Sequence, residues 1–156
     1  MANINSLEWR LFSFHELTTS LLYDLMRLRQ EVFVVEQNCI YLDADGFDQV
    51  AWHVMGCVEN QCVAYCRLIG PNIKYADPSI GRVVTAPAWR RVGAGKLLMA
   101  TAIQYSQRLW PNTGIRISAQ LYLEKFYQNF GFESVSEPYE EDGILHIEMV
   151  KAPGLD

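Results

Sequence analysis

The sequence has no long apolar run and little positive charge. A membrane span needs about 20 mostly apolar residues, and no stretch of this chain approaches that length. The N-terminal segment carries Glu8 and Arg10 and lacks the apolar core of a signal peptide. The 13 Lys and Arg residues are outnumbered by 18 Asp and Glu, which gives a formal net charge of −5. We therefore expect a cytoplasmic protein whose partner is neither a membrane nor a nucleic acid, because nucleic-acid binders carry a basic surface.

Paired cysteine motifs are also missing. The four cysteines, Cys39, Cys57, Cys62 and Cys66, include no C-x-x-C pair and have mostly apolar neighbours. We expect them to be buried and reduced, as in a cytoplasmic protein. A zinc site made by His53 and the last three cysteines would have a spacing unlike that of known sites, so no metal is predicted.

Half of the 156 residues are apolar, which is enough to form one substantial core. We expect a single domain over residues 1–151 and a flexible tail over 152–156. Monomer and homodimer are both compatible with the sequence. Apolar periodicity predicts strands at 7–13, 51–59, 62–69, 80–85, 115–119, 132–138 and 145–150, with helices at 18–35, 94–109 and 123–130. This order indicates a mixed α/β layer arrangement.

Residues 80–98, IGRVVTAPAWRRVGAGKLL, are the most informative stretch. An apolar strand ends before Pro87, and a helical apolar stripe begins at Ala94. Glycines in the turn between them let a ligand approach the backbone, and the first N–H groups of a helix attract anions. The sequence therefore predicts a diphosphate cradle, formed by Arg90, Arg91, Val92, Gly93, Ala94, Gly95 and Lys96. The alternative is an ordinary strand-to-helix connection with solvated arginines.

Two other phosphate-binding motifs do not fit this turn. A Walker A loop needs a glycine where the chain has Arg90 and a Ser or Thr where it has Leu97. The dinucleotide fingerprint needs a third glycine where the chain has Leu98. What remains is the pattern R-x-x-G-x-G.

R-x-x-G-x-G between a strand and a helix resembles the acetyl-CoA signature of the GNAT N-acetyltransferases. The stretch IRISAQLYLEKFYQNFGF at 115–132 resembles the next strand and helix of that family, with its F-Y-x-x-x-G-F ending. LRQEVFVVEQNCIYLDADGFD at 28–48 and YEEDGILHIEM at 139–149 resemble the ElaA-like subgroup. The resemblance implies an α/β fold with a mixed, mostly antiparallel central sheet flanked by helices. It also implies that the strands at 80–85 and 115–119 splay apart to form a cleft for acetyl-CoA, the acyl donor.

Several site residues follow from this resemblance. The pantetheine arm of the cofactor would lie beside Val83, Val84 and Thr85 as an added strand does, and Gln120 would touch the same arm. Tyr127, the tyrosine of F-Y-x-x-x-G-F, would stand beside the sulfur and protonate the departing thiolate. The alternative for Tyr127 is plain core packing.

The general base that deprotonates the acceptor amine has no motif. Glu36 and His53 are the two candidates, and His146 on the last strand is the third. Arg29 falls on the apolar stripe of the 18–35 helix, and we expect a carboxylate to pair with it, because an unpaired buried charge is costly. Six acids and no Lys or Arg lie between Gln30 and Cys66, which suits a cationic acceptor or an ordinary acidic loop.

The sequence thus predicts an enzyme that moves an acetyl group from acetyl-CoA directly to a primary amine of a small molecule or peptide, in a ternary complex without a covalent enzyme intermediate. Two alternatives remain. The spacing of Arg29, Phe33, Asp45, Phe47, Asp48 and Arg67 resembles that of autoinducer (acyl-homoserine lactone) synthases. Those enzymes use acyl-carrier protein and S-adenosylmethionine, so they do not need so well formed a diphosphate turn. The other alternative is a non-catalytic domain that binds acetyl-CoA as a sensor.

Overall fold

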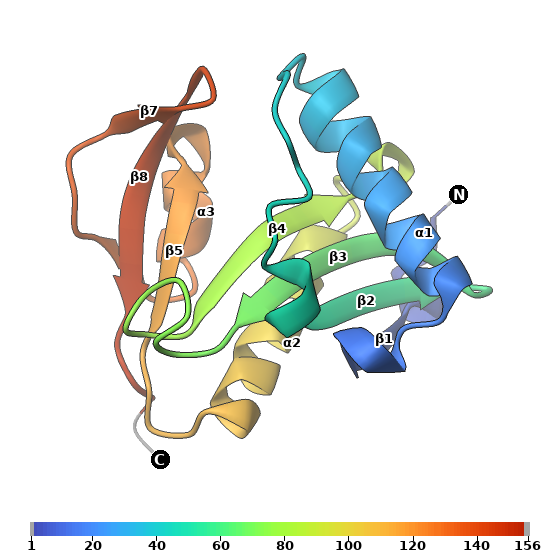
Figure 1. Cartoon of the computed structure of the whole chain (residues 1–156), viewed down its shortest axis with the longest axis horizontal. Coiled ribbons are helices and arrows are strands. Elements are labelled where there is room, and N and C mark those ends of the chain that lie inside the picture. The colour runs from blue at the N-terminus through green and yellow to red at the C-terminus, as the bar shows by residue number, and fades with distance from the viewer. Residues whose placement is uncertain (1, 155–156) are drawn as a thin grey trace.

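A computed structural model describes residues 2–154 of the chain (Figure 1). The strands are β1 (Glu8–Ser13), β2 (Trp52–Val58), β3 (Gln61–Ile69), β4 (Ser79–Thr85), β5 (Ile115–Gln120), β6 (Phe132–Ser134), β7 (Tyr139–Glu141) and β8 (Ile144–Lys151). The helices are α1 (Thr19–Arg29), α2 (Ala94–Leu109) and α3 (Glu124–Gln128). A π-helical segment, Gln30–Glu36, continues α1. Part of the predicted tail, residues 155–156, lies outside the described residues.

All eight strands form one sheet in the order β1-β2-β3-β4-β5-β8-β6, with β7 paired to β8. Neighbouring strands are antiparallel except β4 and β5, which are parallel and share a single residue pair, Ser79 with Arg116. Beyond that pair the two strands diverge, so the sheet opens into two halves (Figure 1). The predicted mixed, mostly antiparallel sheet with splayed strands is confirmed.

Helices cover both faces of the first half of the sheet. On β3, Ala64, Cys66 and Leu68 belong to the cluster packed with α2, whereas Tyr65 belongs to the cluster packed with α1. This alternation follows from the two-residue period of a strand. All four cysteines are buried and free, as predicted.

Arg29 is fully buried at the end of α1 and has the carboxylate partners that the sequence predicted. Its Nε donates to Asp43 Oδ2 at 2.8 Å, and its Nη1 donates to Asp48 Oδ1 at 2.7 Å. Arg67 on β3 binds Asp45 and the same Asp48. These ion pairs fasten the 38–50 loop to both α1 and β3.

Two element boundaries differ from the prediction. The expected strand 132–138 is shorter, because β6 ends at Ser134, and an additional strand that was not predicted, β7, begins at Tyr139. β7 is polar and half exposed at the edge of the sheet, so apolar periodicity gave no signal for it. The helix expected at 123–130 begins as a 3₁₀ turn over Leu121–Leu123 and ends as α3 at Gln128. Within residues 2–154, no helix has the length and apolar character needed to cross a bilayer.

Candidate active site

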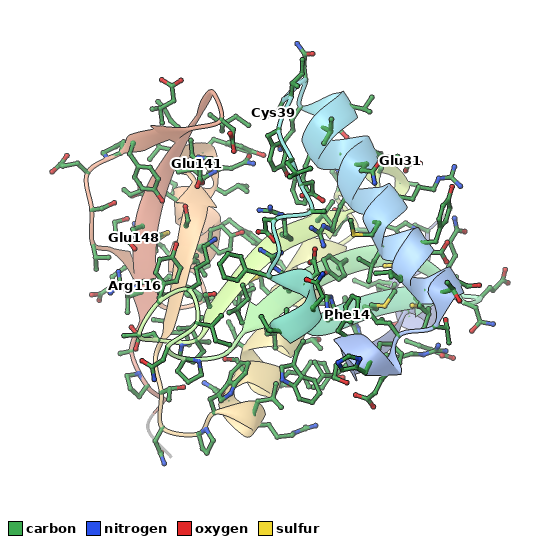
Figure 2. All side chains as sticks on the ribbon, in the orientation of Figure 1. Phe14, Glu31, Cys39, Arg116, Glu141 and Glu148 are labelled. Atoms are coloured by element: carbon green, nitrogen blue, oxygen red, sulfur yellow. The ribbon has the colours of Figure 1, made fainter. Side chains whose placement is uncertain are left out.

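A cavity of about 440 Å³ lies where β4 and β5 diverge. Its walls come from both halves of the sheet, from the segment that follows α1, and from the start of α2. Figure 2 shows how the two sides face each other, with Cys39 beside the end of the α1 helix and Glu141 on β7. Nine of the candidate cofactor-binding and catalytic residues line it: Glu36, Val83, Val84, Thr85, Arg90, Gly95, Gln120, Tyr127 and His146.

A bulge in β4 shapes one wall of the cavity. The register between β3 and β4 shifts between Tyr65 and Arg67, and Arg82 has a left-handed φ of +53°. Bulges of this kind bend a strand and increase its twist. The Arg82 side chain is held by an ion pair of its Nε with Asp43 Oδ1 at 2.8 Å. Beyond Ser79, β4 pairs with β3 on one side only, so the backbone edge at Val83–Thr85 faces the cavity and not a neighbouring strand.

The predicted diphosphate cradle forms the turn into α2, although only part of it reaches the cavity wall. Arg90 and Gly95 line the cavity, whereas Arg91, Val92, Gly93, Ala94 and Lys96 complete the turn and the first helical positions. Gly93 is the N-cap and has a φ of +91°, a conformation that favours glycine. A Cβ added at Gly95 would have Phe126 Cζ as its nearest neighbour, at 4.0 Å, so the space beside this glycine is open.

Glu36 lines the cavity as a partner of Arg90. The Arg90 guanidinium donates from Nη1 to Glu36 Oε1 at 2.6 Å and from Nη2 to Oε2 at 2.8 Å. The hydrogen bond and charge of Arg90 lower the pKa of the Glu36 carboxyl. Both oxygens are therefore engaged by a cation, which makes Glu36 a poor proton acceptor in this arrangement.

His53, the other base candidate, does not face the cavity. Its side chain is fully buried, with Nδ1 at 2.7 Å from the Tyr65 hydroxyl and Nε2 at 2.9 Å from the Asp48 carbonyl oxygen. Burial lowers the pKa of this imidazole. The expectation that His53 faces the cleft is wrong. β2 is an interior strand with both faces covered, so its sequence could not indicate whether either face lines the cleft.

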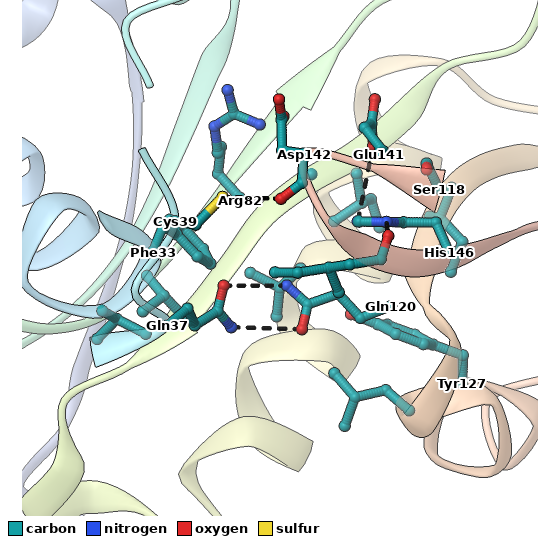
Figure 3. A pocket seen from close by; sticks show the side chains of 18 of the residues that line it. Phe33, Gln37, Cys39, Arg82, Ser118, Gln120, Tyr127, Glu141, Asp142 and His146 are labelled. Atoms are coloured by element: carbon teal, nitrogen blue, oxygen red, sulfur yellow. Dashed lines mark hydrogen bonds and ion pairs between the residues drawn. The ribbon is translucent and has the colours of Figure 1, made fainter. Parts of the chain in front are cut away.

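Two polar contacts join the sides of the cavity (Figure 3). The side-chain amides of Gln37 and Gln120 exchange two hydrogen bonds, each of 3.3 Å. Cys39 Sγ donates to the Asp142 carbonyl oxygen at 3.2 Å. The segment that follows α1 therefore reaches across to β5 and to the β7–β8 turn. Gln37 was not predicted as a site residue, because only the long-range pairing of elements brings it opposite Gln120.

Tyr127 lies at the inner wall with 6% of its surface exposed. Its ring meets the edges of Phe126 and Phe132 at centroid distances of 5.2 and 6.1 Å. Burial raises the pKa of its phenol, so the hydroxyl keeps its proton at neutral pH. Among residues 2–154 the hydroxyl has no hydrogen-bond partner, whereas the ring is packed on its edges. The packed ring fits the interpretation of Tyr127 as a core residue, and the hydroxyl without a partner fits its interpretation as a proton donor.

The third base candidate, His146, lines the cavity from β8 (Figure 3). Three residues that the sequence did not single out lie near it: Ser118 on β5, and Tyr139 and Glu141 on β7. No group of three metal-ligating side chains occurs within the described part of the chain.

A sequence model described as an acetyltransferase (GNAT) domain matches residues 47–153. The chain belongs to the GNAT acetyltransferase family. It is 47% identical over 145 residues to the UPF0039 protein sll0451 of Synechocystis, covering 92% of this chain and 94% of that protein. The crystal structure of an acyl-CoA N-acyltransferase from Pseudomonas aeruginosa matches with a TM-score of 0.90 and 44% identity, over 94% of this chain and all of that one. Escherichia coli ElaA matches with a TM-score of 0.88 and 40% identity, over 93% and 99% of the two chains.

The GNAT fold binds acyl-CoA as a substrate. The predicted likeness to the ElaA-like subgroup is confirmed. A CoA-dependent acyl-homoserine lactone synthase also shares the fold, but at 14% identity this likeness extends to the fold alone.

Proposed function

We propose that this GNAT protein transfers an acetyl group from acetyl-CoA directly to the primary amine of a small molecule or peptide, with both substrates bound together in the cleft between β4 and β5. The observation that carries the proposal is the continuity of one cavity. It joins the glycine turn at the start of α2, the open backbone edge of β4 and the phenol of Tyr127.

Each part of acetyl-CoA has a suitable neighbour along this cavity. The diphosphate suits the N-terminus of α2 together with Arg90, where helix dipole and guanidinium act in the same direction. The pantetheine arm, which carries amide groups, suits the free edge at Val83–Thr85. A backbone N–H near Val84 would hold the oxyanion that forms on the thioester carbonyl. Tyr127 would protonate the departing thiolate.

The test is the release of free thiol from acetyl-CoA in the presence of polyamines, amino acids, aminoglycosides, aromatic amines and lysine-containing or N-terminal peptides. Release that depends on one class of amine, with the acetylated amine recovered by mass spectrometry, is the expected result. Initial rates would be measured while the concentrations of acetyl-CoA and the amine are both varied. Intersecting lines in a double-reciprocal plot would fit a ternary complex, whereas parallel lines would contradict it.

Binding of acetyl-CoA without turnover on any amine would overturn the proposed transfer and favour the sensor. Failure to bind acetyl-CoA at all would overturn the assignment of the cavity. Turnover with S-adenosylmethionine as the amine-bearing substrate would favour the autoinducer-synthase alternative.

A further inference from the structure

We infer that His146, supported by Glu141, is the base that takes the proton from the acceptor amine, and that the amine therefore binds at the end of the cavity formed by β5, β7 and β8. This inference rests on the proposed function and adds to it the place of the acceptor and the identity of the base.

The hydrogen bonding of the imidazole sets its tautomer. His146 Nδ1 lies 2.7 Å from the carbonyl oxygen of Ile144. A carbonyl oxygen can only accept, so Nδ1 carries the proton in this contact. In the neutral ring Nε2 then holds the lone pair. The ring is thus fixed by the backbone of its own strand in the form that a base requires.

The position of the ring gives this lone pair access to a substrate. His146 lines the cavity, and 12% of its side chain is exposed. Its Nε2 is 3.6 Å from Glu141 Oε2, which is too long for a hydrogen bond but suits an ion pair once the ring is protonated. Glu141 would therefore stabilise, through its negative charge, the imidazolium that forms when the proton arrives.

Neighbouring side chains restrict the orientation of the His146 ring. Tyr139 stacks on it at a centroid distance of 6.1 Å and an interplanar angle of 24°, and the hydroxyl of Tyr139 is hydrogen-bonded to that of Ser118. Gln120 is the residue of β5 paired with His146. His146 thus lies between its strand partners Gln120 of β5 and Tyr139 of β7, at the wall of the cavity.

Other charged groups lie around this end of the cavity. Glu148, two residues along β8, is paired with Arg116 at 3.2 Å, and both are visible together in Figure 2. Asp142 and Lys74 line the same cavity from the β7–β8 turn and from the loop that follows β3. An ammonium substrate would meet the carboxylates of Glu141 and Asp142 on its way to the base.

The remaining base candidates are engaged elsewhere. Glu36 lines the cavity from the segment that follows α1 and binds Arg90 through both oxygens. His53 has both ring nitrogens occupied inside the core. Among the histidines of the described residues, His146 is the one that lines the cavity.

The proton balance of the step is complete with these residues. His146 Nε2 takes one proton from the acceptor ammonium, and the free amine attacks the carbonyl carbon of the thioester. The C–N bond forms and the C–S bond breaks. Tyr127 gives its phenolic proton to the sulfur and regains one from the new amide nitrogen, so that CoA leaves as the thiol. The proton on His146 passes to solvent, which regenerates the base.

The variant His146→Asn tests the inference, because asparagine keeps a donor for the Ile144 carbonyl and removes the nitrogen that acts as base. With acetyl-CoA and the amine that the panel identifies, kcat/KM should fall about 10²-fold or more, while the Kd for CoA stays unchanged. The acidic limb of the pH profile should disappear. Glu141→Gln should give a smaller loss of kcat/KM, because the imidazolium that forms in the step loses its carboxylate partner.

The matched control is His15→Asn, an exposed histidine in the turn after β1 that does not line the cavity. It should behave as wild type. If His146→Asn keeps the wild-type kcat/KM and acidic limb, the inference is overturned while the proposed function stands. If His146→Asn proves unfolded by circular dichroism, Glu141→Gln decides, and a wild-type kcat/KM in that variant overturns the inference. A wild-type protein that binds acetyl-CoA but acetylates nothing would overturn both.

Discussion

Glu36 and Arg90 form a bidentate ion pair at the wall of the cavity, with N–O distances of 2.6 and 2.8 Å. One residue ends the π-helical segment after α1, and the other precedes α2. Both are partly exposed, with 43% and 37% of their side chains accessible. A guanidinium binds carboxylate and phosphate with the same fork geometry. In the proposed cofactor complex, Glu36 would therefore compete with the diphosphate for Arg90.

This competition predicts that Glu36→Gln binds CoA more tightly than wild type. Exposed ion pairs contribute about 0.2–1 kcal/mol, so the Kd should fall roughly 1.4- to 5-fold by that measure. Arg90→Ala should weaken binding, and its effect should shrink as salt rises, because the lost contact joins a charge to a phosphate. Isothermal titration calorimetry with CoA at two salt concentrations measures the Kd of each variant and its dependence on salt.

The control for Glu36→Gln is Glu31→Gln, which breaks a similar ion pair with Arg27 on the surface of α1. Its affinity for CoA should equal that of wild type. Weaker CoA binding in Glu36→Gln would contradict the competition and would indicate that the carboxylate itself supports the bound cofactor.

Gly95→Ala should separate stability from cofactor binding. The nearest atom to an added Cβ is 4.0 Å away, and the residue is helical, so the fold accommodates alanine. Alanine in place of a helical glycine stabilises by roughly 0.5–1 kcal/mol, and less than that in a first turn. Thermal unfolding should therefore show an unchanged or higher Tm, while CoA affinity falls because the methyl group enters the cavity.

A substitution at Gly93 would not separate stability from cofactor binding. Its φ of +91° strains any other residue, and an added Cβ would lie 3.2 Å from Ile4 Cδ1. A loss of binding in Gly93→Val would thus mix cofactor contact with damage to the turn. Wild-type CoA affinity in Gly95→Ala would remove the α2 turn from the cofactor site.

The turn into α2 could be predicted from the sequence because its signal is local. Glycine spacing, a strand that ends at a proline and a helical stripe all lie within residues 80–98, and the structure contains each element where the pattern indicates it. The partnership of Glu36 with Arg90 could not be predicted in this way. It depends on the π-helical turns over Gln30–Glu36, which rotate the end of the first helix relative to a regular α-helix.

Long-range strand pairing accounts for the other differences. His53 and His146 both follow alternating strand patterns, and only the order of strands decides that the first is enclosed and the second faces the cavity. β7 is short and polar, so its sequence resembles a turn. Its pairing with β8 nevertheless brings Tyr139 and Glu141 to His146.

Tyr127→Phe should reduce turnover and leave cofactor binding intact. The phenol is buried at the cavity wall, and removing its oxygen deletes a proton donor without changing the packing of the ring. A general acid contributes about 10²–10⁴-fold, so kcat should fall by at least about 10²-fold with an unchanged Kd for CoA. Tyr105→Phe on α2, outside the cavity, is the matched control. Equal kcat values for the two variants would assign Tyr127 to packing alone.

Asp48→Asn should lower the free energy of unfolding and make that free energy less dependent on pH in the acidic range. Burial would raise the pKa of Asp48, but the hydrogen bond and charge of Arg29 and the charge of Arg67 lower it below its ordinary value. A carboxylate with a lowered pKa stabilises the fold above its unfolded pKa, near 3.9, and loses that contribution as the pH falls through the folded value. Removing one partner of a buried ion pair costs about 3–5 kcal/mol. Urea unfolding at pH 7 should show this loss.

At pH 3 the difference in free energy of unfolding between Asp48→Asn and wild type should narrow, because pH 3 lies below the unfolded pKa near 3.9 and the unfolded wild-type chain then takes up a proton at Asp48 that the folded chain resists. Asp24→Asn on α1 is the control, since Asp24 makes no ion pair within residues 2–154. It should lose less than about 0.5 kcal/mol, as surface substitutions usually do. A constant difference between wild type and Asp48→Asn at both pH values would show that Asp48 acts through packing and neutral hydrogen bonds. The ion pairs of Asp48 with Arg29 and Arg67 would then not be what fastens the 38–50 loop to α1 and β3.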